Sequence, residues 1–251
     1  VVPEGYTLNQ IAEAVEKSGN KKVSISAKDF LSKVQDESFI SKMVAKYPKL
    51  LANLPSKDSG VRYRLEGYLF PATYNYGKDT TVKEMIDQLA AMDQNLSPYY
   101  ETLESKNINV NEVLTLASLV EKEGATDQDR KDIASVFYNR LNQDMPLQSN
   151  IAILYAEGKL GQKTTLKEDA TIDTELDSPY NIYKNTGLMP GPVDNPGVSA
   201  IEAAVNPSKT DYLYFVANVE NGEVFFAKTY EEHNKNVEEH VNSKLTQASS
   251  N

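Results

Sequence analysis

The sequence contains no cysteine. Disulfide bonds and thiolate metal sites are therefore excluded, although the lack of cysteine is compatible with an oxidising compartment. No apolar run reaches the ~18 residues that a membrane-spanning helix needs, and no signal-peptide pattern occurs. Because the chain begins with "VVPEGYT" and has no initial methionine, we expect a fragment or processed product from which any anchor has been removed.

An excess of positive charge is also missing, because 36 acidic residues outnumber 26 lysines and arginines and give a net charge of −10. A general nucleic-acid-binding protein needs a basic patch that neutralises phosphates, so we expect no nucleic-acid partner. An acidic surface suits neutral or cationic partners, although it more often serves only to keep a protein in solution. The length of 251 residues is enough for one large domain or two modest ones.

Histidine is scarce as well, and the two that occur, His233 and His240, lie seven residues apart on one face of a predicted terminal helix. Two histidines alone make a poor metal site, so we interpret both as surface or packing residues. The sequence therefore predicts no metal ion and no cofactor.

Residues 1–58 are predicted to form a small α+β module. Thr7 and Gln10 have the spacing of a capping box at the start of a first helix. A short strand near Val23–Ile25 and helices over 27–35 and 37–46 complete this part. The stretch "LPSKDSG", residues 54–60, is polar and rich in residues that interrupt helices and strands, so it is the expected boundary.

The second predicted domain, residues 59–245, is mainly helical. Apolar residues at helical spacing predict helices over 80–95, 110–123 and 128–142 and around 150–156, with a charged helix at 230–245. Ser199 and Glu202 are expected to cap one more helix. The stretch "DYLYFVANVENGEVFFA" predicts a β-hairpin that turns at Asn221-Gly222. Residues 246–251 are expected to form a disordered tail.

A passage rich in proline, glycine, aspartate and asparagine covers residues 161–198 and ends in "GLMPGPVDNPG". It is too long for a passive connection in a compact domain, which makes it a candidate binding loop. The alternative is a well-packed irregular segment.

Two glutamates close the predicted helix 110–123, in the stretch "SLVEKEG". Helix positions two apart diverge by roughly 200°, so Glu121 and Glu123 cannot share a face. Extending the apolar stripe of the helix by three residues reaches Glu123; the stripe consists of Val113, Leu116, Ala117 and Val120. Glu121 lies towards the edge of that stripe, where we expect a surface pair with Lys122 or Arg130.

Gly124 is a natural residue to follow the end of this helix, which places Glu123 in the last turn. There the negative end of the helix dipole and partial burial both disfavour a charged carboxylate. We therefore expect the pKa of Glu123 to be raised, so that it can donate a proton near neutral pH. The alternative is that Glu123 is a solvated residue at a frayed helix end.

The motifs "LASLVEKEG", "ASVFYNRL", "MPLQSN", "SPYNIYKNTGLMPGPVDNPGVSAIEAAVNPS" and "YLYFVAN" occur in one order along the chain. In that order they resemble the MltG/YceG family of endolytic murein transglycosylases. The stretch "EGYLFPATY" resembles the opening of that family's catalytic domain, and "VVPEGYTLNQIA" resembles the LysM-like module before it. The resemblance runs from residue 1 to about residue 240.

The resemblance implies an α+β protein, with a small LysM-like N-terminal module followed by a mainly helical, lysozyme-like catalytic domain that carries a β-hairpin. It implies anchoring in the bacterial cell membrane by one helix, with this portion on the extracytoplasmic side, and work beside penicillin-binding proteins. The implied substrate is peptidoglycan, cut at the MurNAc–GlcNAc β-1,4 bond within a glycan strand to leave a 1,6-anhydro-muramyl end. The second glutamate of "EKE", Glu123, corresponds to the catalytic acid and base.

Other residues match family motifs that the resemblance associates with the cleft. Amides and tyrosines suit neutral sugars, since they offer hydrogen bonds to hydroxyl groups and aromatic faces to sugar rings. The predicted substrate-binding residues are Asn139, Arg140, Gln148, Asn150, Tyr180, Asn181 and Tyr183, and "GLMPGP" is expected to form the rim. Each of them can instead be scaffold, and for Asn139 and Arg140 we weigh a structural role equally.

The sequence departs from the family at Asn150, where members commonly have aspartate. If that carboxylate tunes the acid or orients substrate, activity is weakened here. Two alternatives to a transglycosylase stay open, namely a non-catalytic glycan-binding or scaffolding protein and a muramidase that hydrolyses the bond. A muramidase needs a second carboxylate, for which the loop offers Asp173, Glu175 and Asp177.

Overall fold

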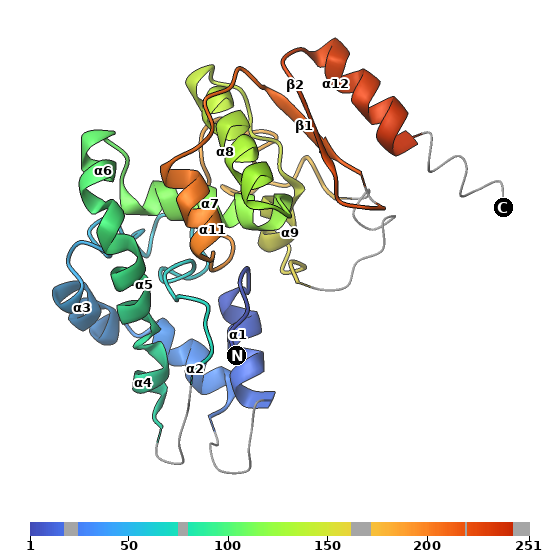
Figure 1. Ribbon diagram of the computed structural model, residues 1–251. Helices are drawn as coiled ribbons and strands as arrows, with labels where there is room; N and C mark the ends of the chain where they lie inside the picture. Colours follow the sequence, from blue (N-terminus) through green and yellow to red (C-terminus); the bar gives the residue numbers. More distant parts are fainter. Residues whose placement is uncertain (18–24, 75–79, 162–171, 219, 243–251) are drawn as a thin grey trace.

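The computed structural model describes residues 1–17, 25–74, 80–161, 172–218 and 220–242. Helices form most of it, and two antiparallel strands form a small sheet near the C-terminal end (Figure 1). The helices and strands are α1 (Leu8–Lys17), α2 (Ala27–Val34), α3 (Glu37–Lys46), α4 (Val82–Ile86), α5 (Gln88–Leu96), η1 (Ser97–Tyr99), α6 (Tyr100–Ser105), α7 (Val110–Glu123), α8 (Asp127–Asn142), α9 (Asn150–Ala156), α11 (Val198–Val205), β1 (Tyr214–Ala217), β2 (Val224–Ala227), α12 (Tyr230–Val237) and η2 (Glu238–Asn242).

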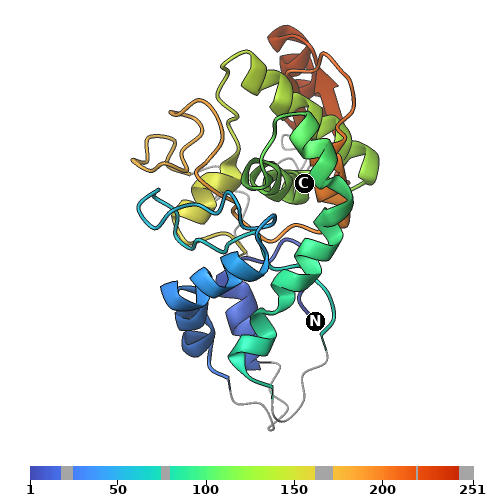
Figure 2. The same cartoon turned by 90° about the vertical axis from the view of Figure 1, so that its left-hand side faces the viewer.

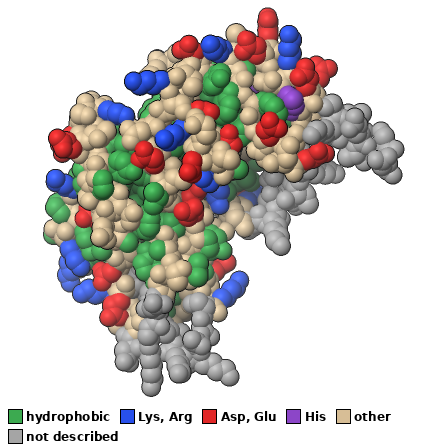
Figure 3. All heavy atoms as spheres, in the orientation of Figure 1, with side chains coloured by type: hydrophobic (Ala, Val, Ile, Leu, Met, Phe, Trp, Pro, Cys, Tyr) green, Lys and Arg blue, Asp and Glu red, His purple; other side chains and the backbone are tan. Residues whose placement is uncertain are grey.

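Helices α1 to α4 form one end of the molecule, and the hairpin with α12 forms the other, as two perpendicular views agree (Figures 1 and 2). On the face in Figure 3, acidic and basic side chains are interspersed rather than gathered into a patch of one sign. No helix in the described part of the chain combines the length and the apolar character that crossing a membrane requires.

The N-terminal helices lie where the sequence predicts them. Thr7 and Gln10 form the expected capping box, in which the backbone N–H of each residue donates to the side chain of the other, at 3.0 and 3.2 Å. The apolar stripe of α1 is buried against α2. Of the strand expected near Val23–Ile25, residues 23 and 24 lie outside the described residues, so the LysM-like character of this part stays a prediction.

The single helix predicted over 80–95 is instead two helices, α4 and α5, which meet at Asp87. A capping box between Thr81 and Glu84 starts α4 as a regular helix. At Asp87 ψ opens to 0°, which interrupts the helical hydrogen-bond series before α5 begins. Aspartate is a poor residue for a helix interior, and an apolar stripe alone does not reveal such a break.

Helix α7 lies at the centre of the larger part of the molecule. It begins with a capping box between Asn109 and Glu112, and every residue from Val113 to Val120 is buried. Helices α8, α9 and α11 all pack against it. A helix that is buried on all sides has no solvent-facing edge, so neither glutamate at its end continues an exposed face.

The start of α11 differs from the prediction. Ser199 and Glu202 do not cap it, because Gly197 precedes the helix and no side chain of α11 itself binds the free backbone N–H groups. The Ser199 hydroxyl instead accepts a hydrogen bond from Arg130 at 3.1 Å. A carboxylate from a different helix, that of Glu121, accepts the Gly197 N–H at 2.9 Å. The cap is therefore a tertiary contact that the local pattern does not contain.

The predicted hairpin is confirmed. Strands β1 and β2 pair antiparallel, with Tyr214 opposite Ala227, and Gly222 has the positive φ of 73° that the turn needs. Helix α12 continues into the π-helical turn η2, which ends at Asn242. The rest of the predicted helix and the tail at 246–251 lie outside the described residues.

The N-terminal segment is hydrogen-bonded to the loop before α11. The N–H of Gly5 donates to the carbonyl of Asn195, and the N–H of Asn195 donates back to the carbonyl of Tyr6, both at 2.9 Å. One buried apolar cluster extends from Val2 to Val205 and so crosses the boundary expected at 54–60. The division into domains at residues 58 and 59 therefore stays a prediction.

Candidate functional site

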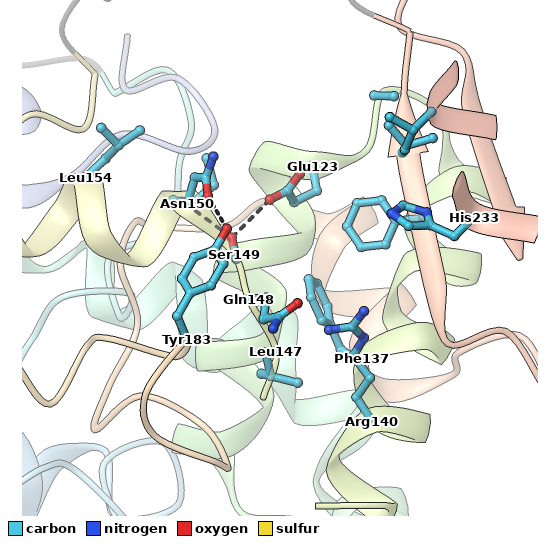
Figure 4. A pocket seen from close by; sticks show the side chains of 15 residues that line it. Glu123, Phe137, Arg140, Leu147, Gln148, Ser149, Asn150, Leu154, Tyr183 and His233 are labelled. Carbon is cyan, nitrogen blue, oxygen red and sulfur yellow. Dashed lines mark hydrogen bonds between the residues drawn. The ribbon is translucent and has the colours of Figure 1, made fainter. Parts of the chain in front are cut away.

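A cavity of about 560 Å³ opens beside the C-terminal end of α7. Its walls come from α7, α8, the start of α9, the loop before α11, β1 and α12, so elements far apart in the sequence meet there (Figure 4). We call it the Glu123 cavity. Polar and apolar side chains both line it; the lining residues are Glu123, Phe137, Arg140, Leu147, Gln148, Ser149, Asn150, Ile151, Leu154, Tyr183, Phe215, Val216, Ala217, His233 and Val237.

Glu123 is half-buried in the last turn of α7, and its Oε1 accepts a hydrogen bond from the Ser149 hydroxyl at 3.0 Å (Figure 4). Burial raises the pKa of the Glu123 carboxyl, and the bond from Ser149 opposes that rise. The direction is the one predicted from the sequence. Burial thus favours the protonated form of Glu123, and the carboxyl lines the cavity.

Gly124 ends α7, but in an extended conformation with φ −110°, and not in the left-handed conformation expected of a residue after a helix. The reason for glycine is space. A Cβ atom built at this position would lie 2.7 Å from Cγ of Arg130. The close approach of α8 to the end of α7 therefore depends on the missing side chain.

Glu121 pairs with Arg130 as expected, with 3.7 Å between Oε2 and Nη2, but not at the surface. Its side chain is only 5% exposed. Burial raises the pKa of Glu121, and its bond to the N–H of Gly197 opposes the rise. Glu121 does not line the Glu123 cavity; it holds α8 and α11 against α7. The two glutamates therefore have different surroundings although both are shielded from water.

Asn150 and Tyr183, two of the predicted substrate-binding residues, both line the cavity and are hydrogen-bonded to each other. The Tyr183 hydroxyl donates a hydrogen bond to Oδ1 of Asn150, so the ring is held across the start of α9 (Figure 4). Burial and the nearby Glu123 carboxylate raise the pKa of Tyr183. Both residues present polar atoms within the same small space as the carboxyl of Glu123.

Arg140 and Gln148 also line the cavity. Arg140 is 8% exposed, and backbone carbonyls fix its guanidinium, with Nε donating to Leu213 at 2.7 Å and Nη1 to Pro146 at 2.8 Å. Gln148 adopts a left-handed backbone conformation with φ 57°, and its N–H donates to the carbonyl of Ile182. A non-glycine residue in that region is uncommon, and here it directs an exposed amide beside the cavity.

Three predicted substrate-binding residues do not line the cavity. The side-chain amide of Asn139 donates to the carbonyls of Thr210 and Tyr212, both at 2.9 Å. Tyr180 is buried against Tyr155, and Asn181 is fully buried and tied to loop carbonyls. These three residues hold the loops around the site in place, which corresponds to the alternative that they are scaffold and do not bind substrate.

The "GLMPGP" segment, residues 187–192, is not the rim of the cavity either. A Cβ built at Gly191 would lie 3.2 Å from Val61, and Pro192 packs closely over Gly67. The segment therefore covers the stretch that follows the predicted domain boundary. Gly191 and Pro192 serve this close packing, which a composition-based prediction cannot distinguish from binding.

The sequence-based prediction missed Ser149 and His233. Ser149 caps α9, with its hydroxyl accepting the N–H of Ile151, and a serine before a predicted helix is a recognisable signal. His233 is half-buried and stacks on Tyr214 at 5.1 Å between ring centroids, so the packing interpretation holds, but it also lines the cavity. Its place there depends on the hairpin, which carries α12 over the end of α7. His240 packs on Phe225.

Asp173, Glu175 and Asp177 are exposed, and none of them lines the Glu123 cavity. Glu175 pairs with Lys184 instead, at 3.3 Å. Among the described residues that line the cavity, Glu123 is the only carboxylate.

Comparisons with known proteins agree along nearly the whole chain. A family model described as the YceG-like family matches residues 1–239. The chain is 66% identical, over 97% of its length, to an endolytic murein transglycosylase of Streptococcus pneumoniae serotype 2 (strain D39 / NCTC 7466). It is 44% identical, over 97% of its length, to an endolytic murein transglycosylase of Bacillus subtilis (strain 168).

The chain spans 45% of the length of the pneumococcal relative and 65% of that of the Bacillus relative. A crystal structure of a yceG-like protein from Listeria monocytogenes is 45% identical and superposes with a TM-score of 0.83, covering 94% of this chain and 74% of that one. Sequence and fold therefore place this chain in the YceG-like family.

Proposed function

We propose that this chain carries the catalytic site of an endolytic peptidoglycan lytic transglycosylase. It would cleave the MurNAc–GlcNAc β-1,4 bond within glycan strands and leave 1,6-anhydro-MurNAc ends. The names of the pneumococcal and Bacillus relatives support this activity. The observation that carries the proposal is Glu123, a half-buried carboxyl with a raised pKa that is held by Ser149 in a cavity lined by both polar and apolar side chains.

Glu123 acts first as an acid. Its proton passes to the glycosidic oxygen, the bond from that oxygen to the muramyl anomeric carbon breaks, and the GlcNAc part leaves with a free 4-hydroxyl. A raised pKa favours the protonated form that this step requires. The resulting carboxylate then takes the proton of the muramyl C6 hydroxyl as its oxygen bonds to the same anomeric carbon. Glu123 is thereby returned to its protonated state.

One carboxylate is sufficient for this sequence of steps. A glycoside hydrolase usually needs two carboxyl groups, because one of them activates water or attacks the sugar. Here the nucleophile belongs to the substrate, and intramolecular attack gains a large entropic advantage over attack by water. Only one carboxylate occurs among the described residues that line the cavity, which agrees with a mechanism that needs one.

The test is a digest of purified peptidoglycan sacculi with the wild-type protein and with Glu123→Gln, followed by mass spectrometry of the product ends. We expect anhydro-muropeptides from the wild type and none from the variant. Products heavier by one water identify a muramidase. Binding of sacculi without any cleavage by the wild type identifies a glycan-binding or scaffolding protein.

Two further expectations rest on the family resemblance alone. They are an anchor in the cell membrane, with this portion on the extracytoplasmic side, and work beside penicillin-binding proteins. Fractionation of cells and cross-linking of the full-length protein test them.

A further inference from the structure

Arg140 is a buried cation whose charge no acidic side chain in the described part of the chain balances. Only 8% of the residue is exposed. Each ion pair found among the described residues involves other side chains. Its Nε and one N–H of Nη1 bind backbone carbonyls, and Nη2 has no hydrogen-bond partner among the described residues. A buried charge without a counter-charge is costly, so such a residue usually has a function.

The groups that face Arg140 are aromatic and uncharged. Its guanidinium lies 5.1 Å from the centroid of the Tyr214 ring. Its charge lowers the pKa values of Tyr183 and His233, although burial makes the net change for Tyr183 upward. His233 is therefore favoured in its neutral form, and it adds no second cation. The guanidinium, whose Nη2 is free among the described residues, lines the same cavity as Glu123 and Gln148 (Figure 4).

We propose that Arg140 binds a carboxylate of the peptidoglycan strand and so selects and positions the muramyl residue that Glu123 cleaves. This inference rests on the proposed function and names a charged feature of its substrate. A planar guanidinium with a free edge matches a carboxylate better than any neutral sugar hydroxyl does. Its backbone bonds orient that edge before the substrate arrives, which reduces the entropic cost of binding.

The glycan itself is neutral, so the carboxylate has two possible sources. One is the stem peptide, and the other is the lactyl group of a muramyl residue from which the stem has been removed. Overall charge cannot explain a preference for either, because a protein of net charge −10 repels acidic strands. If the protein prefers strands that carry carboxylates, a specific binding site for the carboxylate must therefore cause the preference.

The experiment measures binding of uncleaved strands, with every protein carrying Glu123→Gln so that binding is separated from cleavage. Strands with intact stems and strands stripped by an amidase are each compared with the same strands after their carboxylates are converted to methylamides. We expect this conversion to weaken binding by roughly tenfold or more for at least one kind of strand. The kind affected identifies the source of the carboxylate.

The affinity ratio compares strands that have free carboxylates with the same strands after methylamide conversion. Arg140→Gln should reduce this ratio to about one. Arg140→Lys should retain part of the preference, since lysine keeps the charge but lacks the planar guanidinium. Arg64→Gln is the matched control, because Arg64 also donates Nε to a backbone carbonyl, that of Pro55, but pairs with Glu37 away from the cavity. It should leave the ratio unchanged.

Equal binding of charged and neutralised strands by the protein with Arg140 intact overturns the proposal, whether or not the Arg140 variants fold. A ratio that persists in Arg140→Gln also overturns it, because a purely structural role weakens both kinds of binding alike. Failure to bind any strand would instead count against the proposed function.

Discussion

The hydroxyl of Ser149 donates a 3.0 Å hydrogen bond to Oε1 of Glu123 and at the same time accepts the N–H of Ile151 at 3.3 Å. One serine therefore caps helix α9 and orients the carboxyl at the end of α7. Because its single hydroxyl proton is directed to Glu123, the bond favours the charged carboxylate and limits how far burial raises the pKa.

Glu123→Gln should abolish cleavage, with a loss of at least about 10³-fold in kcat, while the melting temperature changes little. The amide cannot donate the required proton, yet it has the size and hydrogen-bonding capacity of the carboxyl. Release of muropeptides and thermal unfolding are measured on the same preparations.

Glu121→Gln is the matched comparison, two residues away. It weakens the contacts with Arg130 and Gly197, so we expect a lower melting temperature and retained chemistry. Normal cleavage by Glu123→Gln together with inactivity of a folded Glu121→Gln protein would reverse the two assignments.

Ser149→Ala should move the alkaline limb of the pH–rate profile to higher pH. Removing the hydrogen bond removes the influence that lowers the pKa of Glu123, so the carboxyl stays protonated further into the alkaline range. Loss of the helix cap should also cost about 1 kcal/mol of stability. Ser149→Thr, which keeps a hydroxyl, should restore both properties. An unshifted limb in a folded Ser149→Ala protein contradicts this view of the bond.

Asn150→Asp should raise turnover on glycan strands, as expected from the family resemblance of the sequence. The aspartate can still accept the hydrogen bond from Tyr183, and its charge should further favour the protonated form of Glu123. Initial rates from acid to neutral pH are the measurement. If the variant is no faster at any pH, that carboxylate is not required here. The masses of the product ends should also be measured by mass spectrometry, since a second carboxylate can position water for hydrolysis.

Tyr183→Ala should weaken the binding of long strands by about 1–3 kcal/mol without unfolding the protein. The side chain is half-buried, lines the cavity and bonds to Asn150, so its loss removes contact area and frees the amide. Tyr180→Phe is a useful contrast, because Tyr180 is buried outside the cavity and should affect stability only. Unchanged strand affinity in Tyr183→Ala would remove this residue from the binding site.

Glu66 should make stability depend on pH. It is 1% exposed, and burial raises its pKa from 4.5 to about 7. The folded state therefore binds the proton more tightly than the unfolded state. The free energy of unfolding should be highest below pH 4.5 with respect to this group and should fall by roughly 3 kcal/mol as the pH rises to about 7.

Urea unfolding of Glu66→Gln over this pH range is the check, and its free energy of unfolding should fall less steeply than that of the wild type. Asp194, which is buried and also has a raised pKa, contributes in the same direction and remains in the variant. Glu13→Gln, at an exposed position of α1, should keep the wild-type slope. An equally steep fall in Glu66→Gln would exclude Glu66 as a source.

Local patterns predicted local structure well. The cap at Thr7, the helix over 150–156 and the hairpin turn at Gly222 follow from residues within a few positions of each other. The direction of the pKa shift of Glu123 followed in the same way, from its place at the end of an apolar helix.

Features that depend on tertiary contacts were not predictable. The burial of Glu121 follows from α11 packing over α7, and the place of His233 follows from the fold of the hairpin. Tyr180 and Tyr183 are three residues apart and have the same chemistry, yet only one lines the cavity. Which of them does so depends on the path of the loop, and that path is set by packing against distant residues.

The hydrogen bonds between the N-terminal segment and the loop before α11 also bear on the order of folding. Asn195 follows Tyr6 by 189 residues, and its side-chain amide donates to the carbonyl of Tyr6 and to the carboxyl of Glu66. Helix α1 can pack on α2 early in synthesis, but the hydrogen bonds that join the segment before it to the loop before α11 form only after Asn195 has been made, so closing this contact is a late step in folding.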